Sequence, residues 1–174
     1  MFSAPRARAQ ELPDLSGTWA QVVVNTSLSH VPVIGNVRSE TRTLLRLRVE
    51  QEGDQLRIVS RVCRIDIEGS SVVRTTIPRA FVNAIPEEVV QVRMAPSNGE
   101  PQLYGWEHLT VLGAALGDRE REPLPTRADD ARVVDLDRDG FPGLTVKVSG
   151  LVSGDVYVAQ RGWSSLRTTR VSED

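Results

Sequence analysis

Short runs of β-type residues, separated by turn residues, follow one another along most of this chain. In residues 41–50, Leu45, Leu47 and Val49 alternate with charged side chains. Alternation with a period of two is the pattern of a strand that has one buried side and one solvent-facing side. Further strands are expected at residues 17–26, 55–66, 72–77, 89–94, 103–112, 144–149, 155–161 and 166–171.

The order and spacing of these runs predict an all-β fold. Gly53, between Glu52 and Asp54, marks a turn, so residues 41–66 are expected to form a β-hairpin. Pro78 begins a segment with room for one helical turn, because proline suits the start of a helix. With about eight or nine strands and regular turn signals, we expect an antiparallel β-barrel, with a β-sandwich as the alternative.

The length of 174 residues suits one domain with a hydrophobic core. Residues 13–174 are expected to form this single β domain. Residues 1–12 lack the apolar segment of a signal peptide, but Ala7, Arg8 and Ala9 have the small-x-small form of a cleavage site. This segment is interpreted either as a disordered N-terminus or as the remnant of a signal peptide.

Composition narrows the function classes. The net charge is −2, which argues against nucleic acid as a partner, and no apolar run reaches the length of a transmembrane helix. Cys63 is the one cysteine, so no intrachain disulfide forms, and its place in a strand run predicts a small buried side chain. Together with His30 and His108 it supports neither a zinc site nor a Cys/His pair, and no catalytic residue is assigned.

Three aspartates at alternate positions, Asp135, Asp137 and Asp139, form the strongest chemical signal in the chain. Carboxylate oxygens are the ligands that calcium prefers, and Gly140 allows the sharp bend that wrapping an ion requires. The carbonyl of Phe141 is the expected fourth protein ligand. Since the run leads into a strand and no nucleophile and base lie nearby, we expect a structural Ca²⁺ site. The alternative is a polar turn in which the aspartates bond backbone N–H groups.

The segment from Asp135 to Leu144 resembles the calcium loops of integrin-type propeller repeats, which run Asp-x-Asp-x-Asp-Gly-x-x-Asp before a strand. It departs from them at the ninth position, where Gly143 replaces an aspartate. Asp129, Asp130 or water are the candidates to complete the coordination. An EF-hand is excluded, because its twelfth position would be Val146 and a strand follows instead of a helix.

Gly17 and Trp19 resemble the Gly-x-Trp signature at the first strand of lipocalins and related calycin barrels. The resemblance implies a closed barrel that holds small apolar ligands, in which the tryptophan packs under an arginine of the last strand, here Arg161 or Arg167. Residues 140–146 together with 157–161 also look similar to uncharacterised secreted proteins of GC-rich Gram-negative bacteria, which implies no activity.

Tyr104, Trp106 and His108 fall on one face of the run at residues 103–112, which makes them candidate contacts for a small apolar ligand or a glycan. The expected function is therefore a non-catalytic, secreted or surface β-barrel with a structural calcium loop. The alternatives are a metal-assisted enzyme acting at the barrel mouth and a structural module of a larger envelope protein. From the calcium argument we expect an extracytoplasmic location, periplasmic, surface or secreted.

Overall fold

The computed structural model describes residues 12–31, 35–69, 73–97, 100–105, 107–151 and 153–165. Ten strands and one helix occur in these residues. They are β1 (Gly17–Val31), β2 (Gly35–Glu52), β3 (Gln55–Glu68), β4 (Val73–Thr76), α1 (Arg79–Ala84), β5 (Glu88–Ser97), β6 (Glu100–Gly105), β7 (His108–Leu112), β8 (Leu144–Gly150), β9 (Gly154–Val158) and β10 (Gln160–Ser164).

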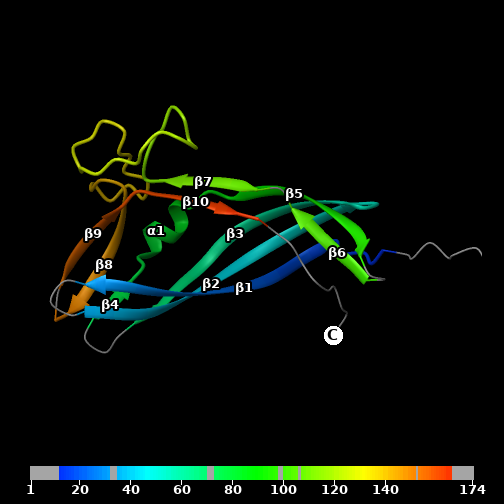
Figure 1. The fold of residues 1–174 in the computed structure, drawn as a ribbon, viewed down its shortest axis with the longest axis horizontal. Coiled ribbons are helices and arrows are strands. Elements are labelled where there is room, and N and C mark those ends of the chain that lie inside the picture. The colour runs from blue at the N-terminus through cyan, green and yellow to red at the C-terminus, as the bar shows by residue number, and fades with distance from the viewer. Residues whose placement is uncertain are drawn as a thin grey trace, which may run out of the picture.

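The main element is an antiparallel five-stranded sheet with the strand order β1-β2-β3-β5-β6. Its long strands twist along the whole molecule in Figure 1 and curl into a half-barrel. β1 and β6 lie at opposite edges, so the sheet is not closed within the described residues. The expected all-β fold is confirmed, whereas the closed barrel is not.

The described residues also form two smaller sheets. One has the order β4-β8-β9 and lies at one end of the molecule in Figure 1, and in the other β7 pairs with β10 nearer its middle. Helix α1 contacts β3 and β8 and so joins the large sheet to the three-stranded sheet. Pro78 is its N-cap, which agrees with the predicted helical turn. No helix in the described part of the chain is both long enough and apolar enough to cross a membrane.

Several strand predictions hold. The hairpin of β2 and β3 turns at Gly53, and the alternation of Leu45, Leu47 and Val49 with exposed charged residues is present. The expected single strand at residues 103–112 is wrong, because β6 and β7 divide this run between two different sheets. The strand expected at residues 166–171 lies outside the described residues.

Cys63 is exposed, which contradicts its expected burial. The pairing of β2 with β3 shifts at this point: Leu44 faces Arg64, and Leu45 faces Val62. Cys63 is the extra residue of this β-bulge. A bulged residue is left unpaired and disturbs the local ladder, so its place in a strand run does not guarantee burial.

Two hydrophobic clusters hold the fold together. The first joins the large sheet to the segment before β1, through buried residues that include Leu56 and Met94. The second packs Phe81 of α1 against Leu144 and Val146 of β8. Leu144 is 0% exposed, and burying a leucine fully contributes about 1.5–3 kcal/mol. The strand that follows the aspartate run is therefore fixed in the core at its first residue.

Candidate metal centre

Asp135, Asp137 and Asp139 lie together in the loop that leads into β8. One carboxylate oxygen from each residue lies within 4.8 Å of those from the other two. Asp135 and Asp139 are exposed, while Asp137 is half-buried. The convergence expected from their alternate spacing is present, and the three side chains could together hold a metal ion.

The loop is bent by hydrogen bonds from its own backbone to these carboxylates. Asp135 accepts from the N–H groups of Asp139, at 3.2 Å, and of Gly140, at 2.9 Å. Asp139 accepts from the N–H of Phe141 at 2.9 Å. These are the bonds of the polar-turn alternative. They do not compete with a metal ion, because each carboxylate offers about four lone-pair sites.

Asp137 differs from the other two aspartates in the partners of its oxygens. Its Oδ2 accepts from the backbone N–H of Thr145 at 3.0 Å, which ties the middle of the loop to β8. Its Oδ1 is buried and has no hydrogen-bond partner. A buried carboxylate oxygen without a partner costs free energy, so this atom is the part of the loop most in need of a cation or a water.

Gly143 shows why the ninth position of the loop is not an aspartate. Its φ is +81°, which side-chain-bearing residues rarely adopt, and a Cβ here would lie 2.6 Å from the carbonyl oxygen of Val158. Its own carbonyl accepts from the N–H of Leu136 at 2.9 Å. Close packing against β9 therefore excludes the ligand that the propeller repeats carry at this place.

The neighbouring acidic residues Asp129 and Asp130 do not complete the cluster. Asp129 pairs with Arg127 at 2.8 Å and Asp130 with Arg132 at 2.6 Å. The Arg132 guanidinium lowers the pKa of Asp130 to about 2. Both carboxylates are thus neutralised by arginines, which leaves backbone carbonyls and water to add ligands.

The three clustered aspartates have no such partner. Among the described residues, no arginine, lysine or histidine forms an ion pair with Asp135, Asp137 or Asp139. Arg138 lies between them in sequence, in a left-handed conformation with φ 58° and with an exposed side chain. Three carboxylates close together without a cation repel one another, which favours uptake of a positive ion.

The long segment before the loop is anchored by two arginines. Arg132 donates to Glu122 Oε1 at 2.8 Å and to the carbonyl of Pro123 at 2.9 Å, besides pairing with Asp130. Arg161 of β10 donates to the carbonyls of Glu120 and Glu122. These contacts fix the path of residues 113–132.

Two exposed aromatic rings stack beside the loop. The ring centroids of Phe141 and Tyr157 are 5.4 Å apart, and the ring planes differ by 15°. Tyr157 lies opposite Thr145 in the β8–β9 pairing. The stack therefore links the end of the loop to β9, the strand that Gly143 also packs against. The predicted role of the Phe141 carbonyl as a ligand stays a prediction.

A hollow of about 490 Å³ lies between α1 and the aspartate loop. Its lining residues come from these two elements and are Ala80, Asn83, Ala84, Leu136, Asp137 and Arg138. Asp137 thus borders both the cluster and this cavity. No local pattern pointed to Asn83 or to the cavity, because α1 reaches the loop only through tertiary packing.

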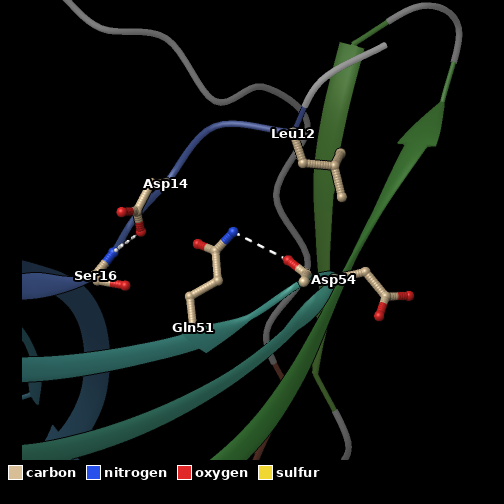
Figure 2. A pocket seen from close by; sticks show the side chains of 6 residues that line it. Leu12, Asp14, Ser16, Gln51 and Asp54 are labelled. Atoms are coloured by element: carbon tan, nitrogen blue, oxygen red, sulfur yellow. Dashed lines mark hydrogen bonds between the residues drawn. The ribbon is translucent and has the colours of Figure 1, made fainter. Parts of the chain in front are cut away.

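A second hollow, of about 470 Å³, lies under the segment before β1 (Figure 2). Asp14 and Asp54 lie on opposite sides of Gln51 in this view. Asp14 accepts from the N–H of Ser16, and Asp54 pairs with Arg93 at 2.7 Å. The two carboxylates are held by these separate partners and do not converge on a common point.

The residues proposed to contact a ligand are divided between two strands. Tyr104 lies on β6 and donates to Gln102 Oε1 at 2.8 Å, whereas His108 lies on β7 with its Nε2 3.0 Å from Glu88 Oε1. Trp106 lies outside the described residues. The single strand face on which the three were expected to lie together does not exist.

The tryptophan of the lipocalin-like signature is half exposed, and its Nε1 donates to the carbonyl of Leu15 at 2.9 Å. Arg161, one candidate partner, lies over the ring of Trp163 instead, with its Cζ 5.9 Å from the ring centroid. Arg167, the other candidate, lies outside the described residues.

The chain matches no protein-family model, no curated protein and no solved structure. The chemistry of the aspartate loop therefore has to be argued from its own residues.

Proposed function

We propose that Asp135, Asp137 and Asp139 bind one structural Ca²⁺ ion in a non-catalytic, extracytoplasmic β domain. The observation that carries the proposal is the convergence of three carboxylates with no basic partner, one of which has a buried oxygen without a hydrogen bond. A hard cation satisfies that oxygen and cancels the repulsion in one step.

The number of ligands is consistent with calcium and with modest affinity. Three carboxylates and the Phe141 carbonyl supply four oxygen positions, and water supplies the rest of the usual 6–8. Sites with few protein ligands lie at the weak end of the calcium range, with a Kd of about 10⁻⁴ M or higher. Such a site fills in extracellular calcium and stays empty in cytosol, which is the reason for an extracytoplasmic location.

A structural role follows from what the loop joins. Asp137 bonds the N–H of Thr145, a residue 2% exposed at the start of β8, and Phe141 stacks on Tyr157 of β9. An ion at the aspartates would therefore hold the loop against two strands of one sheet. The domain itself is proposed to bind a small apolar ligand or a glycan, and a co-purified ligand in a native mass spectrum tests that part.

Thermal unfolding tests the calcium site. With a Kd of about 10⁻⁴ M, a hundredfold excess of Ca²⁺ adds about 2.7 kcal/mol relative to EDTA. For a chain of this length the midpoint then rises by about 5–10 °C. Asp137→Asn keeps an acceptor for the N–H of Thr145 but removes the charge, so the rise should disappear. Asp129→Asn changes an aspartate outside the cluster and should retain it.

The two controls make a negative result clear. Magnesium at the same concentration should give a much smaller rise, because it dehydrates reluctantly and requires a regular octahedral site. If calcium leaves the midpoint of the unmodified chain unchanged, the aspartate run is a polar turn only and the proposal is wrong.

The cavity beside Asp137 favours one second candidate, a metal-assisted enzyme that acts in this cavity. Metal-assisted chemistry requires a metal with an open coordination position that faces a pocket. Asp137 belongs to the aspartate cluster and also lines this cavity, so an ion held by the cluster would lie next to the pocket. Calcium-dependent cleavage of simple esters or phosphodiesters, abolished by filling the cavity with Ala84→Trp, would support this candidate. Equal rates in calcium and in EDTA would eliminate it.

A further inference from the structure

β1 is an edge strand whose outer side has no partner strand in the described structure. On its inner side all 15 residues pair with β2 in one uninterrupted register, from Gly17 opposite Val49 to Val31 opposite Gly35. The sheet order ends at β1, which lies along one side of the long sheet in Figure 1. The outer N–H and C=O groups of such a strand form a template for another strand.

The composition of β1 lacks the features that usually protect an edge. Its sequence, GTWAQVVVNTSLSHV, contains no lysine, arginine, aspartate, glutamate or proline. β6, at the opposite edge of the same sheet, has six residues and includes Glu100 and Pro101. Charges, proline, bulges and short length are the common means of preventing edge pairing, and β1 has none of them.

One face of β1 carries three exposed apolar side chains. Val22, Val24 and Leu28 lie on one face of the strand, with Thr26 between the last two, and they are 62%, 53% and 70% exposed. Leu44 of β2, which lies opposite Val22, is 39% exposed and extends this apolar stripe. A strand added along β1 would bring its own side chains beside these residues, so apolar burial would accompany the new backbone hydrogen bonds.

We propose that a second copy of this chain pairs with β1, antiparallel, about a two-fold axis near Val24. Val24 is the midpoint of the strand, so this axis sets Val24 opposite its own copy, Val22 opposite Thr26 and Ala20 opposite Leu28. Such a contact is isologous and closes after two copies. It satisfies the open edges of both chains at once.

Electrostatics permits this pairing. β1 carries no charge that its copy would repel, and the nearest basic side chain opposite the midpoint is Arg42 on β2, which pairs with Glu40 at 2.7 Å. In the dimer the two β2 strands would be separated by three strand spacings, about 14 Å in total. That distance exceeds the screening length of about 8 Å at physiological ionic strength.

Analytical ultracentrifugation of the full chain tests the proposal. The molar mass measured by sedimentation for the unmodified chain should be twice the 19.2 kDa of one copy. Val24→Lys adds a charge at the centre of the interface and should give the monomer with unchanged β content by circular dichroism. The matched control is Val156→Lys on β9, because Val156 is 48% exposed and lies in the three-stranded sheet, and it should remain a dimer.

Hydrogen exchange separates edge pairing from contact through a sheet face. Pairing along the edge should slow exchange of the outward amides of β1 as protein concentration rises, and Val24→Lys should reverse this. A monomer at every concentration overturns the proposal, and so does a dimer that survives Val24→Lys. A dimer whose β1 amides still exchange rapidly also overturns it, because the contact would then lie elsewhere.

Discussion

Replacing Gly143 by alanine should destabilise the protein more than the same change at Gly140. Both residues have positive φ, +81° and +88° respectively, so each alanine carries a backbone strain of about 1–2 kcal/mol. A Cβ at Gly140 meets nothing within 4 Å, whereas at Gly143 it would lie 2.6 Å from the carbonyl oxygen of Val158. Gly140→Ala therefore carries the backbone strain without the steric conflict.

The steric conflict at Gly143 sets the size of the difference. Moving the Val158 carbonyl away means displacing β9, and forcing extra atoms into packed structure costs about 1–3 kcal/mol. Gly143→Ala should thus lower the free energy of unfolding by about 3 kcal/mol, or the midpoint by about 6–12 °C. Gly140→Ala should cost about 1 kcal/mol, since alanine also reduces the entropy of the unfolded chain.

Urea and thermal unfolding of the two variants, in EDTA so that no ion contributes, give the comparison. Equal destabilisation by the two changes would refute the reasoning, because it would mean that the loop does not pack against β9 at Gly143. The same packing predicts that Gly143→Asp fails to add a calcium ligand, despite restoring the residue found in the propeller repeats.

Three further predictions concern contacts around the loop. Arg132→Met should remove part of the acid dependence of unfolding, because Arg132 lowers the pKa of Asp130 from its ordinary 3.8 to about 2. The stabilisation from this pair is present above the unfolded-state pKa of Asp130 and is lost as pH falls through its lower folded-state pKa. In Arg132→Met, the free energy of unfolding measured in urea should therefore change less with pH over this interval than in the unmodified chain, and an unchanged pH dependence would contradict the pairing. Arg161→Met should expose residues 113–131 to limited proteolysis, because it removes two bonds to the backbone of that segment, whereas unchanged cleavage would contradict the anchoring role. A double-mutant cycle of Phe141→Ala and Tyr157→Ala should give a coupling of about 0.5–1.5 kcal/mol in unfolding, and additive effects would deny the stack.

Local patterns in the sequence predicted what depends on neighbouring residues. The alternation of Leu45, Leu47 and Val49 predicted a half-buried strand, and the spacing of Asp135, Asp137 and Asp139 predicted carboxylates that converge. Both predictions rest on geometry that the chain carries over a few residues. For the same reason the sequence predicted the turn at Gly53 and the helical turn that begins after Pro78.

Features that depend on distant segments were not predictable in this way. Gly143 departs from the propeller loops because of Val158, fifteen residues further on, and no local pattern signals that contact. The run at residues 103–112 has the alternation of one strand, but its two halves pair with different partners, β5 and β10. The lipocalin resemblance offered Arg161 or Arg167 as the partner of Trp19. Arg161 lies instead over Trp163 and binds the segment around Glu120, whereas Arg167 lies outside the described residues.

The sequence also pointed to the wrong solvent exposure where the backbone is irregular. Cys63 lies in a strand run, but the bulge at this point places it on the surface. Conversely, Thr145 gave no signal at all, although it is 2% exposed and its N–H holds the Oδ2 of Asp137. A backbone donor is invisible in a residue-type pattern, so this support for the aspartate loop required the structure.

Equilibrium dialysis against calcium tests the central claim most directly. The full chain should bind one Ca²⁺ ion, with a Kd of about 10⁻⁴ M or weaker, and Asp137→Asn should reduce binding at least tenfold, while Asp129→Asn should not. Calcium binding that is absent from the unmodified chain, or unchanged in Asp137→Asn, would contradict the account.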